Sequence, residues 1–137
     1  SEEKEIMKKQ TGLDWSPKED GGHLINAWNL AGIILGAGDN LDLRQRETID
    51  AIRAETSAKQ MHHAIWDFSE INAFKKTNKP SLVMCSEDDV LWPLFERALE
   101  VRPDAESAVV KGGDFQPDND PQSVAEALGR FISKMEG

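Results

Sequence analysis

The sequence predicts an α/β protein in which a helical N-terminal part precedes a β-α-β-α unit with two parallel strands. Residues 1–78 carry apolar side chains at helical spacing and offer no candidate strand. Residues 79–137 contain two short apolar runs, 82–85 and 107–110, and each run precedes an amphipathic helix. Strands joined through one helix by short connections pair in parallel with a right-handed crossover.

Composition limits the classes of function. The chain of 137 residues has a formal net charge of −9, which argues against nucleic acid or an anionic membrane as the main partner. No apolar run approaches the roughly 20 residues of a membrane span. Cys85 is the only cysteine, so an internal disulfide is excluded. With a charged N-terminus unlike a signal peptide, these features predict a cytoplasmic protein without a membrane partner.

The N-terminal part is expected to be a series of helices. Residues 2–10 are charged and weakly helical, and a loop follows them. A helix is predicted over 23–35, capped by Asp20. Its second half is apolar on so many sides that little of it is expected to face water. The glycine-rich segment 36–40 ends this helix.

A third helical segment is predicted from Leu41 to about Phe68, with a break around 54–57. Glu55 and Lys59 lie four residues apart in the favourable order for a helical ion pair, and so do Asp42 and Arg46. A short helix over 69–76 then leads to the first strand.

The first strand organises the C-terminal part. It follows Pro80 and ends in Ser86-Glu87-Asp88-Asp89, so carboxylates gather at its carboxyl end, the edge where open α/β sheets place their chemistry. Its continuous apolar character predicts burial on both faces. A helix is predicted over 93–101, and Asp120-Pro121 is a typical start for the last helix, 122–135.

Several of these motifs resemble the last third of an α/β-hydrolase. The matching segments are Pro-Ser-Leu-Val-Met-Cys-Ser-Glu-Asp-Asp at 80–89, Trp-Pro at 92–93, and Gly-Gly-Asp-Phe-Gln-Pro at 112–117. The helical segment from Asp20 to Trp28 is similar to the lid that many such hydrolases insert before this strand. The resemblance implies a lid-like segment over 1–78 and the acid- and histidine-bearing portion over 79–137.

The resemblance also assigns candidate catalytic positions. Asp89 falls where the family keeps its triad acid, which orients and stabilises an imidazolium. Asp89 is equally well placed to cap the helix that begins at Pro93. Asp114 falls where the family keeps its histidine, and a carboxylate cannot relay a proton as imidazole does near neutral pH. No Gly-x-Ser-x-Gly nucleophile elbow is present. The chain by itself is therefore expected to be catalytically inactive.

A lid would cover a pocket for an apolar small molecule. Its candidate lining residues are His23, Trp28, Trp92 and Phe115. His62 and His63 are adjacent on a helix and diverge by about 100°, so they cannot both point at one site. The spacing of cysteine and histidine offers no zinc ligands, and no cofactor is expected.

Three functions remain open. The chain is the lid plus the acid/histidine-loop part of an α/β-hydrolase-like protein, or a stand-alone module derived from that fold that binds a small molecule or a protein, or a small helical α+β domain that binds a protein partner. A sheet of two strands has uncovered edges, and an uncovered edge invites strand addition. We therefore expect a homo-oligomer or a complementing chain along the sheet edge.

Overall fold

The computed structural model describes residues 14–68 and 70–135, except for the side chains of residues 62, 63, 66, 67 and 70. The described part is a mixed α/β chain with a two-stranded parallel sheet, as predicted. The predicted helix over 2–10 lies outside the described residues. In chain order the elements are α2 Gly22–Asn29, a π-helical turn Leu30–Ile34, α3 Leu41–Arg53, α4 Glu55–Asp67, α5 Glu70–Lys76, β1 Leu82–Ser86, a 3₁₀ turn Trp92–Leu94, α6 Phe95–Val101, β2 Glu106–Val110, a 3₁₀ turn Gly113–Phe115, α7 Gln116–Asn119 and α8 Pro121–Met135.

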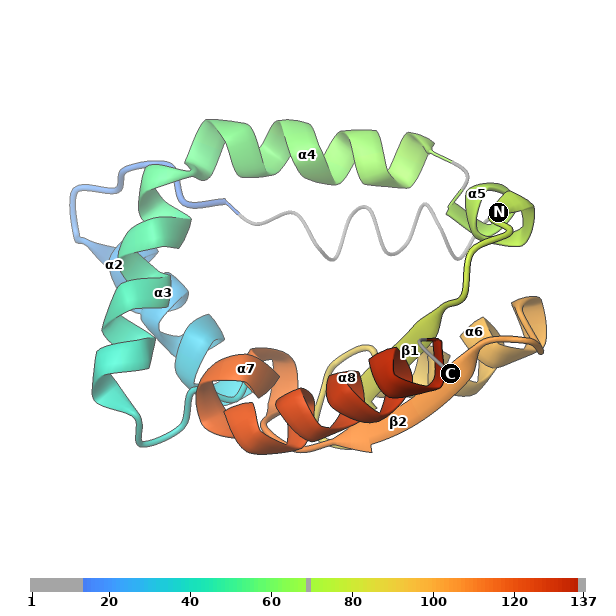
Figure 1. Ribbon diagram of the computed structural model, residues 1–137. Coiled ribbons are helices and arrows are strands. Elements are labelled where there is room, and N and C mark those ends of the chain that lie inside the picture. Colours follow the sequence, from blue (N-terminus) through green and yellow to red (C-terminus); the bar gives the residue numbers. More distant parts are fainter. Residues whose placement is uncertain (1–13, 69, 136–137) are drawn as a thin grey trace.

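These elements are arranged as an open ring (Figure 1). The helical hairpin, which we define as residues 22–53 with α2, the π-helical turn and α3, lies on one side of the ring. The sheet unit, residues 80–135, lies opposite. Helices α4 and α5 connect the two along the top of the view, and the end of the hairpin meets the loop after β2 at the bottom.

The helical hairpin is held by polar contacts around small residues. Arg44 of α3 lies over the Trp28 ring at 4.5 Å and donates from Nε to the Trp28 carbonyl oxygen at 2.8 Å. Gly32 makes room for this guanidinium, because a Cβ there would lie 2.1 Å from Arg44 Nε. The Asn40 side chain caps α3 by accepting from the Leu43 N–H at 3.2 Å. The hairpin thus depends on side-chain fit more than on a large core.

The predicted break in the long helical segment is confirmed at Ala54. This residue has φ −84° and ψ 2°, and it separates α3 from α4 without any intervening loop. The expected ion pair between Lys59 and Glu55 is present at 2.7 Å. Arg46 pairs instead with Glu47 and with a residue far along the chain, Asp118, in place of the expected Asp42.

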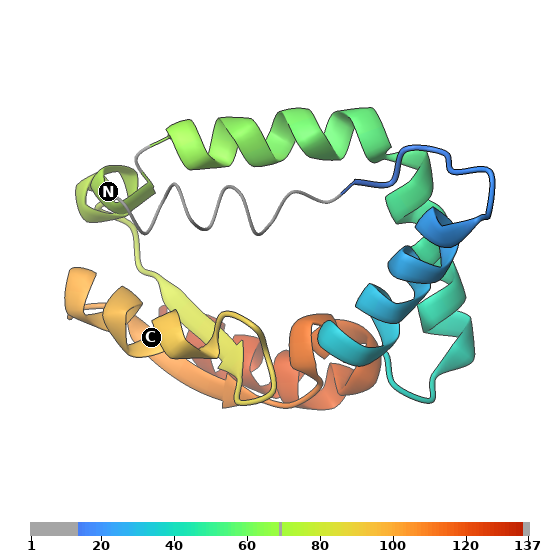
Figure 2. The same ribbon diagram turned by 180° about the vertical axis from the view of Figure 1, so that it is seen from behind.

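Each face of the sheet is covered by the helix that follows one of the two strands. Leu82 of β1 pairs with Glu106 of β2, and the register continues to Ser86 opposite Val110. Helix α6 packs on β1 and α8 on β2, on opposite faces of the sheet as the two views together show (Figures 1 and 2). Helix α6 connects the two parallel strands, as the predicted β-α-β-α order requires.

Among residues 14–68 and 70–135, no strand pairs with the outer edge of β1. The Glu106 N–H donates to the Ser81 carbonyl oxygen at 2.9 Å, which fixes the phase of the parallel ladder. In a parallel ladder alternate residues face the two edges, so the N–H and C=O groups of Leu82 and Met84 face away from β2. Within the described residues no hydrogen bond from another segment reaches them. This edge is therefore open to another strand.

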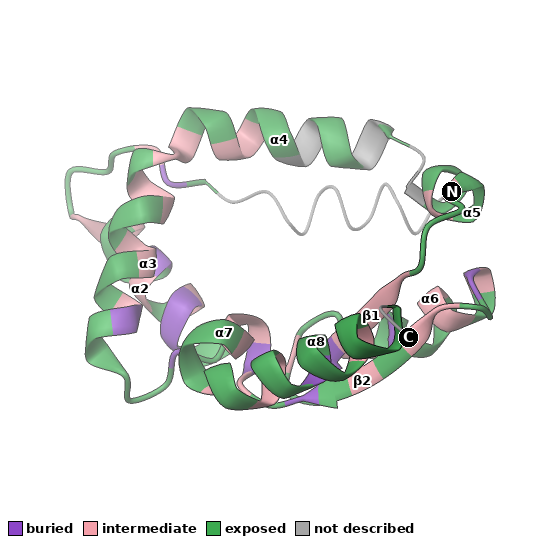
Figure 3. Cartoon of the chain, in the orientation of Figure 1, coloured by how far each residue is buried: buried purple, intermediate pink, exposed green. Residues whose placement is uncertain are grey.

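The core is small (Figure 3). The buried apolar residues are Trp15, Ala27, Ala31, Ala37, Leu43, Cys85, Phe95, Val110 and Ala127. Several larger side chains are exposed instead, among them Val90, Leu91, Leu94, Val109, Leu128, Ile132 and Met135. Burying one such side chain is worth roughly 1.5–3 kcal/mol, so their exposure is costly. The chain leaves much of its apolar surface without cover.

Two burial predictions are wrong. The second half of the predicted 23–35 helix was expected to be shielded from water, but Ile33 and Ile34 are 74% and 55% exposed. The buried residues of this turn are the small ones, Ala31 and Gly32, and the turn packs on α3. The strand β1 is fully buried only at Cys85 and Ser86, while its first three residues are half-buried.

A buried arginine joins α5 to the sheet unit. Arg102, 5% exposed, donates to the carbonyl oxygens of Phe74, Thr77 and Lys79 at 3.0–3.2 Å and pairs with both oxygens of Asp104 at 2.7 Å. Three of its acceptors belong to the end of α5 and the segment after it. This one side chain therefore fixes where the connecting helices meet the sheet.

No helix among the described residues combines the length and apolar character needed to cross a membrane.

Candidate functional site

The carboxyl ends of β1 and β2 bring two of the predicted residues together. Asp89 follows β1 in a tight turn in which its N–H donates to the Ser86 carbonyl oxygen at 3.1 Å. Asp114 follows β2 in the 3₁₀ turn Gly113–Phe115. Its Oδ1 accepts from the Val90 N–H at 3.0 Å, which ties the two loops to each other. The adjacency that the sequence resemblance implies is thus present at this edge.

The surroundings of the two carboxyl groups differ. Asp89 accepts from the Leu91 N–H at 2.7 Å through Oδ1 and from the Gln116 side-chain amide at 2.7 Å through Oδ2. Burial raises the pKa of the Asp114 carboxyl, the Val90 N–H lowers it in part, and the charge and hydrogen bond of Asp89 raise it further. Asp114 therefore holds a proton more readily than an exposed aspartate does.

The contacts of Asp89 differ from the capping role that the sequence predicts. The N-cap of the 3₁₀ turn is Leu91 and that of α6 is Leu94, both without a side-chain cap, and Asp89 accepts from the Leu91 N–H at 2.7 Å within its own turn. Its second oxygen points across to the loop after β2 and meets Gln116, as a residue at the sheet edge can. Sequence reasoning missed Gln116, and its position two residues after Asp114 was the only signal available.

Ser86 fixes the edge on which these groups sit. This side chain is 1% exposed, and its Oγ accepts from the N–H groups of Gly113 at 3.2 Å and Asp88 at 3.3 Å. Both β-strand loops are therefore pinned by one hydroxyl. Because its oxygen is buried and already accepts two hydrogen bonds, Ser86 is a structural residue and is not placed to act as a nucleophile.

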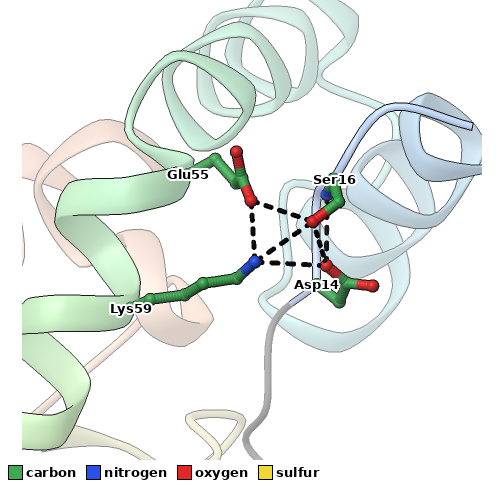
Figure 4. Close-up of polar contacts among 4 residues, drawn as sticks. All are labelled: Asp14, Ser16, Glu55 and Lys59. Atoms are coloured by element: carbon green, nitrogen blue, oxygen red, sulfur yellow. Dashed lines mark hydrogen bonds and ion pairs between the residues drawn. The ribbon is translucent and has the colours of Figure 1, made fainter.

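A second polar cluster lies where the loop before α2 meets α4 (Figure 4). Ser16 Oγ lies 2.6 Å from Asp14 Oδ1, 3.0 Å from Glu55 Oε1 and 3.2 Å from Lys59 Nζ. A serine beside a lysine suits nucleophilic catalysis only if the lysine is neutral. The hydrogen bonds that Lys59 donates to Glu55 and Asp14 raise its pKa instead, so the lysine stays protonated. The cluster ties the loop to α4.

Three of the four predicted pocket residues make local contacts within their own part of the chain. His23 Nδ1 accepts from the Lys18 N–H at 3.1 Å, and Trp28 carries the Arg44 guanidinium. Trp92 stacks on Phe95 with ring centroids 5.1 Å apart. Phe115 is half-buried in the loop after β2. His23 and Trp28 thus belong to the helical hairpin, and Trp92 and Phe115 to the sheet unit.

The described residues contain no group of three or more histidine, cysteine, aspartate or glutamate side chains arranged to hold a metal ion. The side chains of His62 and His63 lie outside the described part, as does that of Trp66.

What the sheet edge can do chemically follows from these contacts. Burial raises the pKa of Asp114, which makes this carboxyl a better proton carrier than an exposed aspartate, and the Gln116 amide, which donates to Asp89, can orient the Asp89 carboxylate. The edge offers no imidazole and no accessible serine among the described side chains, so acyl transfer here would need groups from another segment.

Comparison with known proteins gives no match to a family model, to a curated protein or to a solved structure.

Proposed function

We propose that this chain is the lid plus acid/histidine-loop portion of an α/β-hydrolase-like protein, and that it acts only when another segment completes its sheet. The observation that carries this proposal is the open outer edge of β1. Parallel sheets occur almost only with both faces covered and are rarely so small. The strand β1 has the apolar sequence of an interior strand, yet its outer edge is unpaired. We therefore regard this two-stranded sheet as incomplete.

The exposed apolar side chains support the same proposal. Val90 and Leu91 follow β1, Val109 lies on β2, and Ile132 lies on α8, and each is between 46% and 57% exposed. These residues all belong to the sheet unit. A neighbouring strand and the helices that accompany it would cover them, and the gain per side chain would be roughly 1.5–3 kcal/mol at full burial.

Catalysis by the chain alone is not expected. Asp114 stands where the resemblance implies a histidine, and the hydroxyl of Ser86, at the end of β1, is occupied by the Gly113 and Asp88 N–H groups. We expect no turnover of a short-chain nitrophenyl ester above background by the purified chain. Turnover that disappears in Asp89→Asn would contradict this expectation.

Proline substitution tests whether the β1 edge receives a strand. The Met84 N–H faces away from β2, so Met84→Pro removes an outward donor and leaves the ladder to β2 intact. The matched control is Met84→Ala, which shortens the same side chain and keeps the N–H.

Sedimentation at low micromolar concentration is the measurement. We expect the parent chain and Met84→Ala to form a homo-oligomer or to retain a co-purifying chain, and Met84→Pro to sediment as a monomer of about 15.3 kDa. Equal assembly of the proline and alanine variants would contradict strand addition at this edge, provided that both variants keep the parent circular dichroism spectrum.

A stand-alone binding module is the second candidate, and one observation favours it. Ile25, Ile33 and Ile34 are 59%, 74% and 55% exposed on the helical hairpin, away from the sheet edge. An aliphatic patch at this place fits contact with a protein partner. Loss of partner capture in Ile33→Ser, with the β1 edge unaltered, would favour this candidate over the first.

A further inference from the structure

The phase of the β1 ladder determines which residues can pair at its outer edge. Because the Glu106 N–H bonds the Ser81 carbonyl oxygen, every second residue from Ser81 onward faces β2. The residues between them turn their N–H and C=O groups outward, and they are Leu82, Met84 and Ser86. Of these outward groups only the Ser86 carbonyl oxygen bonds a described residue, in the turn that follows the strand. The outward groups therefore form a row with Met84 at its centre.

Two copies of this row fit each other. A two-fold axis perpendicular to the sheet sets the two β1 edges against each other with the strands antiparallel. With the axis at Met84, this residue faces its own copy, and Leu82 of each copy faces Ser86 of the other. All these pairs join outward-facing residues, as the hydrogen-bonded pairs of antiparallel strands require. The Ser86 carbonyl oxygen takes part through its second lone pair.

The charges at the two ends of β1 are complementary in the same register. Lys79 precedes the strand, Glu87 follows it, and both residues are exposed. Within the described part of the chain neither side chain forms an ion pair. The antiparallel register sets Glu87 of one copy opposite Ser81 of the other, and Lys79 follows two positions further on the same face. Long side chains reach each other across such a diagonal.

The opposite strand direction would be unfavourable for two copies. A parallel pair sets the start of one strand beside the start of the other, so Lys79 would approach Lys79 and Glu87 would approach Glu87. Like charges at neighbouring positions of a sheet are destabilising. The distribution of charge along β1 therefore favours the antiparallel pair, which forms the Lys79–Glu87 contact twice.

The apolar side chains of β1 would also gain cover from a second copy. Leu82, Val83 and Met84 are only half-buried, although the strand is apolar. In the two-fold register Met84 lies against its own copy on one face, and Val83 lies beside Cys85 of the other copy on the opposite face. Removal of such apolar surface from water is the main favourable term in most protein association.

We propose that the strand that completes the sheet is β1 of a second copy of this chain. The two copies form a four-stranded sheet in the order β2–β1–β1–β2, with an antiparallel central pair and the two-fold axis at Met84. This inference rests on the proposed function, because both need the outer edge of β1 to be paired, and it names the partner.

Charge reversal at the two ends of β1 tests this pairing. Lys79→Glu turns both symmetry-related contacts of the dimer from attraction into repulsion, and so does Glu87→Lys. Lys79 accepts from Arg102 through its main-chain oxygen, so the substitution leaves that bond in place. In sedimentation over a range of concentrations, we expect either variant alone to dimerise with a dissociation constant raised by roughly tenfold.

The decisive measurement uses an equimolar mixture of these two variants. In a mixed dimer the introduced glutamate faces the introduced lysine, and the native Lys79 of one variant faces the native Glu87 of the other. Both contacts are attractive again, so we expect the mixture to dimerise with the affinity of the parent. Lys111→Glu is the matched control, because it changes the charge of an exposed lysine beyond the end of β2 by the same amount; it should dimerise as the parent does.

The outcomes separate this inference from the proposed function. A mixture that associates no better than its components, with parent circular dichroism spectra, would overturn pairing with a second copy. Should Met84→Pro still abolish assembly in that case, the edge receives a strand from a different chain and the proposed function stands. A parent chain that sediments as a monomer of about 15.3 kDa would overturn both.

Discussion

The effect of Gly32→Ala on the free energy of unfolding is expected to change sign when Arg44 is replaced by alanine. In the parent, the new Cβ would overlap Arg44, at 2.1 Å from Nε and 2.2 Å from Cζ. The guanidinium is the flexible end of its side chain, so it would leave while the backbone stays. The cost of the substitution is therefore the loss of the contacts that Arg44 makes with α2.

The magnitude follows from those contacts. Arg44 donates to Trp28 O at 2.8 Å, which is worth about 1.5 kcal/mol at a half-buried site, and lies over the Trp28 ring, worth about 0.5–1 kcal/mol. Replacing glycine by alanine inside a helix returns about 1 kcal/mol. The net expectation is a destabilisation of about 1 kcal/mol in the parent.

In an Arg44→Ala background no guanidinium occupies the space beside Gly32. Gly32→Ala should then stabilise the protein by about 1 kcal/mol, so the double-mutant cycle should yield a coupling of about 2 kcal/mol. Urea unfolding followed by circular dichroism measures all four free energies of unfolding. Additive effects, or destabilisation by Gly32→Ala in both backgrounds, would refute the idea that Arg44 occupies the space beside Gly32.

Three further predictions concern single contacts. Asn40→Ala should lower the free energy of unfolding by about 1 kcal/mol, the usual effect of removing an N-cap, and urea unfolding checks it. Arg102→Lys should lower Tm, because one ammonium group cannot replace the planar fork that reaches Phe74, Thr77 and Lys79; an unchanged Tm in calorimetry would contradict it. Hydrogen bonds from Ser16, and then Lys59, lower the pKa of Asp14 to about 2. Its contribution to stability is therefore present above its ordinary pKa and lost as the pH falls toward 2, and Ser16→Ala should raise that pKa in a carboxyl-carbon NMR titration.

The sequence was informative where short-range physics decides the outcome. The helix break near Ala54, the two strands and their parallel pairing followed from hydrophobic periodicity and chain connectivity. The resemblance assigned family positions to Asp89 and Asp114, and the structure places both residues in the loops at the carboxyl ends of β1 and β2, where the Val90 N–H donates to Asp114.

Burial could not be predicted in the same way. Periodicity identified Ile33 and Ile34 as apolar positions, yet their cover depends on elements that a local pattern does not reveal. The same limit applies to Arg46, which was assigned a partner four residues away and instead pairs with Asp118 of α7. Long-range polar contacts leave no periodic signal, and Gln116 was missed for that reason.

The central claim is that the outer edge of β1 receives another strand. Hydrogen exchange at the Met84 amide of the assembled protein tests it most directly, because this N–H has no acceptor within the described residues while the Val83 and Cys85 amides face β2. A paired edge predicts protection of Met84 comparable to that of its two neighbours. Exchange of Met84 at the rate of an unstructured peptide, beside protected Val83 and Cys85, would contradict the account.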